Sequence, residues 1–448
     1  MRVSNFLNNE LVDFASYSTL RAIASLVDGQ KNASRKILYA VQKKNITKDI
    51  KVEILSGTTS ILTEYLHGPQ NLNDVIVGLA QIHTGSNNIP LLKREGNFGT
   101  RHEPEASAPR YIFTYKEDIF DKIFVSEDNN VLIHQNFEGT DIEPRFYVPT
   151  LPLILINGSS GIATGFAQKI LPRKPEVIVE YINSYINNDS LPELTPWYRG
   201  FEGTIEKSTE EGDENRYFIK GKIERISSTR FLITEIPIGY NLTSYTKVLD
   251  SLEDKKIIKG YIDKSLDDKF KFEVQMDSKS LKNSDEWILS KMKLVKTVTE
   301  NFTVIDENNR VKSYNSPEEV LNHYIEVKLK YTEKRKEYLL NKIKENILLD
   351  ASKYLFVKGV TEGTIIVNNK KKVEIESQLD SVEKIIKKEG SYDYLLRMPI
   401  HSLTEEKKDE LKSKIHSMKE DLKKLKETSS DSIWADEIKK IEFYKEEI

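Results

Sequence analysis

The stretch DGQKNASRKILYAVQKK, residues 28–44, combines a turn, an apolar helical pattern and a cluster of basic side chains. Asp28-Gly29 is a turn signal, because both residue types tolerate the backbone angles of tight turns. The apolar residues that follow at helical spacing are Ile37, Leu38 and Val41. Arg35 and Lys36 lie beside them. The stretch therefore predicts a short helix with one apolar and one basic face.

The basic character extends beyond this helix. Residues 28–51 hold seven Lys or Arg and two Asp, a local charge of +5, whereas the whole chain is nearly neutral at −3. Residues 51–66 predict a second helix pair that is broken near Gly57. Short helices joined by Gly-containing turns favour a helix-turn-helix type of DNA-binding unit. A solvated basic surface without a ligand is the alternative.

The middle of the chain predicts loops and strands. Residues 85–165 are rich in Gly, Asn and Pro, and within them Leu151–Ile156 is a candidate buried strand. Residues 200–280 predict a β-rich segment. Its clearest half-buried strand has alternating apolar positions, which are Phe270, Phe272, Val274 and Met276.

The last third of the chain predicts two long helices. Residues 316–319, Ser-Pro-Glu-Glu, combine an N-cap Ser, a Pro at the first helical position and a Glu three residues after the cap. Two narrow apolar seams follow, namely Val320, Tyr324, Val327 and Tyr331, and then Leu411, Ile415, Met418, Leu422 and Leu425. Because each seam needs a partner, we expect an antiparallel pair with a compact head at about residues 345–400.

Composition limits the chemistry. The 448 residues suggest roughly two to four domains. The absence of cysteine excludes disulfides, a Cys-ligated zinc site and a Cys nucleophile. The sequence contains no P-loop, no H-E-x-x-H motif and no acidic set of the kind that holds catalytic Mg²⁺. Neither a secretory signal nor a membrane-length apolar run is recognisable, so we expect a cytoplasmic protein without a membrane partner.

Three positions are candidates on chemical grounds. Tyr111 follows Arg110, and Arg101 lies ten residues upstream. A phenol titrates near pH 10, so a nucleophilic tyrosine needs nearby cations, and a core aromatic residue is the alternative. His67 is either a functional group or an ordinary helix C-cap or surface residue. Ile162, on a Gly/Ser-rich loop, either packs into the core or inserts as a wedge between DNA base steps.

Six ordered motifs, spread over nearly the whole chain, carry a family resemblance. They are Arg21–Tyr39, Tyr65–Gly68, Gly85–Ile89 with Gly96–Arg101, Pro109–Thr114, Leu155–Gly165 and Tyr394–Ile400. In order and spacing they resemble the breakage-reunion (A-type) subunit of type IIA DNA topoisomerases. Within that family the likeness is greatest to the medium subunit of T-even-type bacteriophages.

The resemblance implies roles for individual residues. The nucleophilic tyrosine of the family falls on Tyr111, its flanking arginine on Arg110, and the histidine near the reacting phosphate on His67. The intercalating isoleucine falls on Ile162. Residues that hold the scissile phosphate or the flanking DNA fall on Arg21, Lys31 and Arg35, and the basic set that we expect at the DNA extends to Lys36, Lys51 and Arg101. No metal ligand is expected in this chain.

The fold that the resemblance implies is α+β and multidomain. Residues 1–155 would form a winged-helix DNA-binding and cleavage domain, and residues 156–310 a β-rich tower, or shoulder, domain. Residues 311–448 would form a long antiparallel coiled-coil arm, with the small helical dimerisation head at about 345–400.

The implied function is that of the breakage-reunion subunit of an ATP-dependent type IIA topoisomerase. Tyr111 would cut double-stranded DNA through a 5′-phosphotyrosyl link, and later religate it. One tyrosine per strand requires two copies, hence a C₂ dimer. A large partner subunit would bind ATP in its ATPase domain and Mg²⁺ in its Toprim domain, and the enzyme would be active only with that partner.

Two other interpretations remain open at this point. The chain fits the A-type chain of a gyrase or topoisomerase IV that is truncated before its DNA-wrapping domain. From another functional class, it fits a non-catalytic DNA-binding scaffold with a coiled coil. Covalent attachment of DNA to Tyr111 distinguishes the scaffold from the enzyme.

Overall fold

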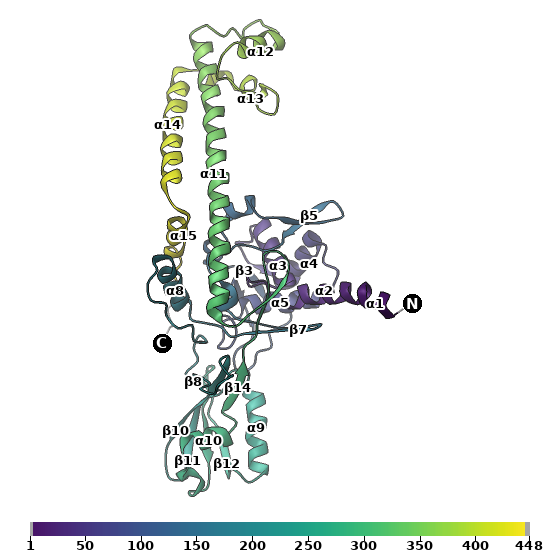
Figure 1. Ribbon diagram of the computed structural model, residues 1–448, viewed down its shortest axis with the longest axis vertical. Helices are drawn as coiled ribbons and strands as arrows, with labels where there is room; N and C mark the ends of the chain where they lie inside the picture. Colours follow the sequence, from purple (N-terminus) through teal and green to yellow (C-terminus); the bar gives the residue numbers. More distant parts are fainter. Residues whose placement is uncertain (1–2, 444–448) are drawn as a thin grey trace. The chain divides into compact units, whose positions relative to one another are not determined.

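The computed structural model describes residues 3–443 and divides into two compact units. The first unit comprises residues up to 328 together with those from 435 onward, and the second comprises residues 329–434. Helix α11 (Pro317–Thr361) continues from the first unit into the second (Figure 1). The domain boundaries expected from the sequence, after residues 155 and 310, both lie inside the first unit.

The amino-terminal part of the first unit is a group of helices beside a small sheet. The helices are α1 (Val3–Asn8), α2 (Glu10–Ala22), α3 (Asn32–Lys43), α4 (Val52–Thr63) and α5 (Pro69–Ala80). The antiparallel sheet has the order β1–β3–β2, from β1 (Ile50–Lys51), β2 (Leu92–Glu95) and β3 (Phe113–Lys116). Phe113 begins the central strand and pairs with Lys51 on one side and Glu95 on the other.

Helix α3 is the helix that residues 28–44 predict, but its basic side chains are not where we expected them. Its apolar residues are buried as predicted, whereas Arg35 and Lys36 are buried too and form internal ion pairs. The expected basic face is therefore wrong at these two positions, and so is a solvated basic surface. Helix α4 is continuous through Gly57, contrary to the predicted break, because a single Gly weakens a helix without ending it.

The next part of the first unit holds two β-hairpins. Its elements are α6 (Phe120–Ile123), a 3₁₀ turn (Ser126–Asn130), β4 (His134–Phe137), β5 (Thr140–Pro144), α7 (Leu153–Ile156), β6 (Ser159–Ala163), β7 (Phe166–Ile170) and α8 (Pro175–Asn187). The predicted strand at Leu151–Ile156 is wrong, since its last four residues form the buried helix α7. A short run of apolar residues is compatible with a buried helix and with a buried strand, so hydrophobic periodicity could not distinguish the two.

Two further sheets follow in the first unit. A three-stranded sheet has the order β14–β9–β8, from β8 (Thr204–Lys207), β9 (Arg216–Lys220) and β14 (Val295–Thr299). A four-stranded sheet has the order β10–β11–β13–β12, from β10 (Lys222–Arg225), β11 (Arg230–Glu235), β12 (Gly260–Asp263) and β13 (Phe272–Gln275). The alternation predicted around β13 is confirmed, because Phe270, Phe272, Val274 and Met276 are all buried.

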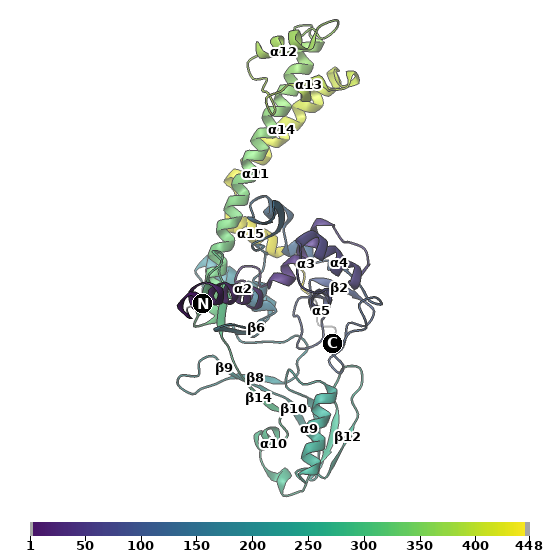
Figure 2. The same cartoon turned by 90° about the vertical axis from the view of Figure 1, so that its right-hand side faces the viewer.

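The four-stranded sheet has its own apolar core. Helices α9 (Leu242–Asp254) and α10 (Asp285–Lys291, after a 3₁₀ turn at Ser280–Lys282) pack on one of its faces (Figure 2). Tyr245 and Leu249 of α9 and Ile288 of α10 lie in one cluster with Phe231 and Phe272 of the sheet. Burial of this apolar surface stabilises the substructure.

Helix α11 begins where the sequence predicts. It follows the hairpin of β15 (Phe302–Ile305) and β16 (Val311–Tyr314). The backbone amide of Glu319 donates to the hydroxyl of Ser316 at 3.3 Å, so Ser316 is the N-cap. The Glu319 carboxylate accepts from the amide of Asn315 at 2.8 Å, one residue earlier than a standard capping box requires.

The second unit contains two long helices and a small helical group. Its remaining elements are α12 (Lys372–Asp380), α13 (Asp393–Leu396), a 3₁₀ turn (Ile400–Ser402), α14 (Glu405–Glu427) and the first residues of α15 (Ser430–Lys439). Helix α14 lies beside α11 (Figures 1 and 2), and Lys414 pairs with Asp350 at 2.7 Å while Ser430 bonds Glu333. The later residue of α14 to α15 contacts the earlier residue of α11, so the two chain directions are antiparallel.

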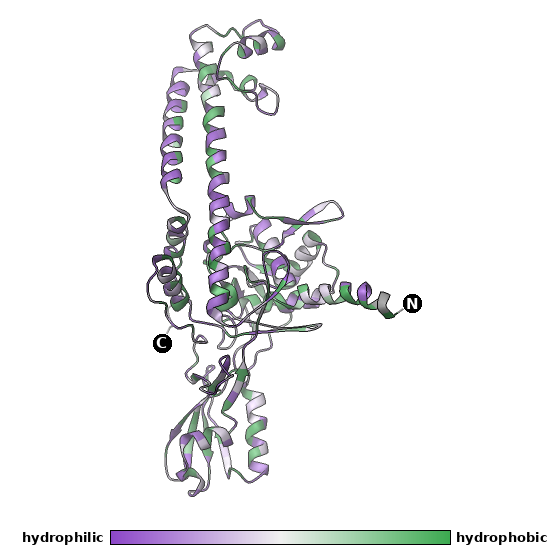
Figure 3. Cartoon of the chain, in the orientation of Figure 1, coloured by the Kyte–Doolittle hydropathy of each residue, from purple (hydrophilic) through white to green (hydrophobic). Residues whose placement is uncertain are grey.

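The surface of this pair is strongly hydrophilic. Most of α14 has hydrophilic colouring, with apolar turns at intervals (Figure 3). Leu411 is buried, and the other seam residues of α14 are half-buried. Residues 355–396 add a separate apolar cluster, which includes Phe356, Leu379 and Leu395.

Gly29→Ala is expected to destabilise the chain. Gly29 has φ of +67°, and an added Cβ would lie 2.5 Å from the backbone nitrogen of Ile154. Strain of this kind costs about 1–3 kcal/mol, so the urea midpoint followed by circular dichroism should fall. Gly57→Ala is the matched control, because its Cβ would meet nothing within 4 Å, and it should gain about 0.5–1 kcal/mol. An unchanged midpoint for Gly29→Ala would contradict the close packing described here.

Candidate cleavage site and nucleic-acid interface

Tyr111 lies at the end of a short loop that leads into β3. Two backbone hydrogen bonds fix this loop on the amino end of α4, from the amide of Val52 to Ile112 O at 3.1 Å and from the amide of Glu53 to Pro109 O at 3.3 Å. The side chain of Tyr111 is 66% exposed, so the alternative of a core tyrosine is wrong. The loop thus presents the phenol to solvent on a fixed backbone.

The surroundings of this phenol favour negative charge. The Arg110 guanidinium lies 4.9 Å from the centre of the Tyr111 ring, a cation–π contact. Lys51, which pairs with Phe113 and precedes α4, is exposed on the adjoining strand. The amino end of α4 adds its partial positive charge. A phosphate group placed at this loop would therefore meet two cationic side chains and a helix amino end.

A second group of predicted residues lines a cavity of about 410 Å³ between α2, α3 and α5. Arg21 and Lys31 are among its lining residues. The Lys31 ammonium donates to Ser160 O at 2.6 Å, and burial lowers the pKa of Lys31. Sequence reasoning missed the other polar side chains of this cavity, which are Tyr17, Ser18, Ser34 and Asn71. Tyr17 could have been found, because it lies four residues before Arg21 on the same face of α2.

His67 belongs with this second group. It lies between α4 and α5, so the alternative of a helix C-cap is wrong, because α4 ends at Thr63. The Tyr17 hydroxyl hydrogen-bonds Nε2 of His67, and the Tyr65 ring lies 5.4 Å away, edge to face. This contact orients the imidazole toward α2. The residues that line the cavity do not include Arg110 or Tyr111, so the predicted residues fall into two groups.

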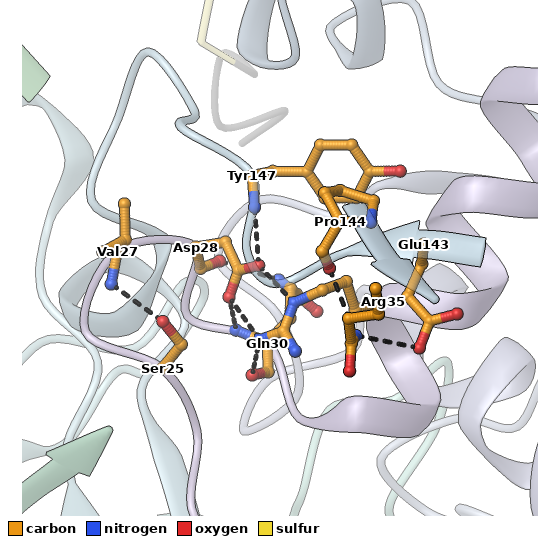
Figure 4. Close-up of polar contacts among 9 residues, drawn as sticks. Ser25, Val27, Asp28, Gln30, Arg35, Glu143, Pro144 and Tyr147 are labelled. Atoms are coloured by element: carbon orange, nitrogen blue, oxygen red, sulfur yellow. Dashed lines mark hydrogen bonds and ion pairs between the residues drawn. The ribbon is translucent and has the colours of Figure 1, made fainter. Parts of the chain in front are cut away.

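Arg35 and Lys36 lie inside the protein rather than on its surface, where we expected them to contact DNA. Figure 4 shows Arg35 beside Asp28. Arg35 donates to both carboxylate oxygens of Asp28, at 2.7 and 3.1 Å, and also to Gln30 O at 3.1 Å. Lys36 pairs with Glu143 at 2.8 Å and donates to Thr63 O at 2.8 Å. Both cations therefore have protein partners where we expected phosphate.

Burial and charge act in opposite directions on Arg35. Burial lowers the pKa of Arg35, but the charge and hydrogen bonds of Asp28 raise that pKa above its ordinary value, so the guanidinium stays charged. Asp28 is fully buried and also accepts from the amides of Gln30 and Tyr147, at 2.9 and 3.0 Å. Its carboxylate thus accepts four hydrogen bonds, which is the arrangement that makes a buried ion pair tolerable.

Arg101 is held in the same way. It is 6% exposed and makes a two-pronged pair with Glu235, at 2.6 and 2.9 Å. Its guanidinium also donates to Ile236 O at 2.8 Å and lies 4.8 Å from the ring centre of Phe270. The expected cation beside Tyr111 is thus part of a junction between the loop after β2 and the four-stranded sheet.

Ile162 lies in the β6–β7 hairpin and is 87% exposed, so the alternative of a core isoleucine is wrong. The hairpin is seated closely on α2, since a Cβ at Gly161 would lie 2.1 Å from Ala22 O. Lys31 holds the neighbouring Ser160. An exposed apolar side chain on an anchored hairpin is the geometry that a wedge between base steps requires.

Comparison with known proteins places this geometry in a family. The family model that matches residues 21–439 describes the A-type chain of DNA gyrase/topoisomerase IV. The chain belongs to this family. Among curated proteins it is 34% identical to DNA topoisomerase 2 of Arabidopsis thaliana, covering 98% of this chain and 33% of that protein. It is 31% identical to DNA topoisomerase 2 of Saccharomyces cerevisiae, covering 98% and 34%.

Solved structures give the same result. The Plasmodium falciparum topoisomerase II DNA-binding, cleavage and re-ligation domain superposes with a TM-score of 0.88 and 33% identity. The match covers 97% of this chain and 63% of that one. The family member described here is thus a mixed helix and sheet protein that resembles a topoisomerase II cleavage and re-ligation domain. It spans about a third of the length of the curated relatives just named.

Residues 3–443 also bear on metal and membrane binding. They contain no group of three or more His, Asp or Glu side chains placed to hold a metal ion. The same residues contain no helix that combines the length and the apolar character needed to cross a membrane.

Asp28→Asn and Arg35→Met are both expected to lower the free energy of unfolding. Removing one member of a buried ion pair leaves the other charge uncompensated, at a cost of about 3–5 kcal/mol. The urea midpoint should fall strongly for both variants. Lys43→Met is the control, because Lys43 is an exposed basic residue of the same helix. An Arg35→Met chain with wild-type stability but weaker DNA binding would instead assign Arg35 to DNA contact.

Proposed function

We propose that this chain is the DNA breakage-reunion subunit of an ATP-dependent type IIA topoisomerase. The observation that carries the proposal is the exposed Tyr111, fixed on the amino end of α4 with Arg110 against its ring. Family membership and the likeness to a cleavage and re-ligation domain support it.

We assign the parts of the fold accordingly. Helices α3–α5 with the β1–β3–β2 sheet would form the winged-helix unit that carries Tyr111. The β8–β14 sheets would form the tower, and the antiparallel helices of the second unit the coiled-coil arm. The small group around α12 and α13 would be the dimerisation head, which is supported by exposed apolar residues there, namely Ile366, Val373 and Ile400.

The chemical step is a transesterification. The phenol oxygen of Tyr111 attacks a backbone phosphorus, an O–P bond forms and the bond from phosphorus to O3′ breaks. The phenol proton passes to a base or to solvent, and O3′ takes up a proton. Phosphorus remains a diester, so the energy of the broken bond is kept for religation. Arg110 and the amino end of α4 would stabilise charge on the phosphate as it develops.

Two copies of the chain are needed for a double-strand break. A C₂ dimer supplies one tyrosine to each strand. The separation of Tyr111 and Arg110 from the cavity with Arg21 and Lys31 also fits a dimer, in which each group would hold a different part of the duplex. Tyr17 would then keep His67 oriented toward the DNA that lies over this cavity.

We further propose that Mg²⁺ and ATP are bound by a larger partner subunit with Toprim and ATPase domains. The described residues offer no acidic cluster that fits a metal ion, so no step of the mechanism above passes through a metal held by this chain. The much greater length of the relatives is consistent with such a division of labour. The assembled enzyme would be a heterotetramer of two copies of each chain.

Tyr111→Phe should abolish covalent DNA attachment while DNA binding persists, because only the phenol oxygen is lost. Denaturing gels of cleavage reactions that contain Mg²⁺ with the partner subunit measure attachment, and fluorescence anisotropy measures binding. Tyr115→Phe is the matched control, since Tyr115 lies on β3 four residues later and should retain attachment. Covalent complexes in the Tyr111→Phe reaction would refute the role of Tyr111. Intact binding without attachment by the wild-type chain would favour the scaffold interpretation.

The purified chain alone should not relax supercoiled DNA in the presence of ATP and Mg²⁺. Agarose electrophoresis of plasmid DNA measures this, and addition of an extract fraction that contains the partner subunit should restore relaxation. Relaxation by the chain free of any partner would show that the proposed division of labour is wrong.

A further inference from the structure

We propose that a groove next to the β6–β7 hairpin is a phosphate-binding site in which Lys169 and Lys296 supply the charge. The groove has a volume of about 470 Å³ and lies within the first unit. Its walls come from the loop after α5, the foot of the hairpin, and strands β9 and β14. None of the residues that we place in the cleavage chemistry lines it.

The charge of the two lysines is not neutralised by the protein. Among residues 3–443, neither ammonium has a carboxylate partner within ion-pair distance, and both lysines are exposed at the groove. Within the same described residues, Lys296 donates a hydrogen bond to Ile238 O, at 3.1 Å. Burial and the charge of Lys169 both lower the pKa of Lys296, so the two ammonium groups repel each other across the groove. An anion between them would relieve that repulsion.

The backbone of the groove lets Lys296 pack closely against Gly239. Gly239 has φ of +96°, and a Cβ there would lie 2.4 Å from the Lys296 ammonium, so only glycine lets the lysine adopt this position without strain. Asn241, the N-cap of α9, is also a lining residue and brings the positive end of that helix to the groove. Arg101, at the same wall, pairs with Glu235 through two of its nitrogens, but among residues 3–443 its buried Nε has no hydrogen-bond partner.

One further polar atom of the groove lacks a partner. Nε2 of His83 is buried and has no hydrogen-bond partner among the described residues. Burial lowers the pKa of His83, so the ring is neutral at pH 7 and adds no positive charge. A ligand or its bound water can satisfy this atom. Two lysines, a helix amino end and a neutral imidazole form a set that suits a phosphate group.

The volume of the groove is in the range of ligand-binding pockets, about 300–1,000 Å³. The phosphate can come from two sources, a free diphosphate or nucleotide, or the backbone of DNA that lies along the hairpin. The inference does not depend on covalent cleavage, and a Tyr111→Phe chain should give the same result in the binding experiments below.

The first experiment titrates the full chain with inorganic pyrophosphate by calorimetry at constant ionic strength. The double variant Lys169→Met/Lys296→Met should bind at least about tenfold more weakly. The control is Lys279→Met/Lys282→Met, which removes the same charge from exposed lysines outside the groove and should bind like the wild type. If both double variants bound pyrophosphate equally weakly, the loss would be due to net charge alone, and the proposal would be overturned.

The second experiment needs no variant and distinguishes the sources. The wild-type chain is treated with a lysine-acetylating reagent, with and without pyrophosphate or a duplex DNA, and each lysine is quantified by mass spectrometry. Protection of Lys169 and Lys296 by pyrophosphate alone assigns the site to free phosphates, and protection by duplex assigns it to the DNA backbone. For DNA, the double variant should also reduce the salt slope of binding by about 2. Protection by neither probe overturns the proposal, whatever the outcome for Tyr111.

Discussion

The buried carboxylate of Asp28 is the contact on which the amino-terminal part of the chain depends. It accepts four hydrogen bonds, two from Arg35 on α3 and one each from the amides of Gln30 and Tyr147. These donors come from a turn, a helix and a loop more than a hundred residues away. Because an unpaired charge is very costly in a buried position, the three segments can form only together. The turn also needs Gly29, whose α-carbon lies against the backbone of α7.

That constraint determines how the two groups of candidate residues are presented. The turn ends at Lys31, whose ammonium holds Ser160, and Gly161 then packs on the end of α2. Ile162 is therefore exposed on a hairpin fixed at its base. The amino end of α4 fixes the loop of Tyr111 through backbone hydrogen bonds. Functional side chains on loops gain precision when the supporting backbone is fixed in this way.

Much of the secondary structure could be predicted because its signals are local. Each of these signals spans only a few residues: the helical spacing of apolar residues in α3, the apolar–polar alternation around β13, and the N-cap of α11. The burial of Lys36 and Arg101 could not be predicted, since their partners Glu143 and Glu235 lie 107 and 134 residues away. Helix α7 could not be predicted either, because its four residues are all apolar and buried, so they show neither helical nor strand periodicity.

Some basic residues are buried and others are exposed, so the local charge of +5 overstates the positive charge that DNA could contact. Charge counted along the sequence treats each Lys and Arg alike, yet a polyanion outside the protein interacts only weakly with a cation that is already paired inside it. Arg35 and Lys36 are paired, whereas Arg21, Lys51 and Arg110 remain available on the surface. The basic surface is therefore smaller than the sequence implies, and the candidate residues on it are divided between the loop of Tyr111 and the cavity beside α2. If the proposed function is right, a duplex that touches both would extend across α3–α5, and the placement of these residues, rather than total charge, would determine where it binds.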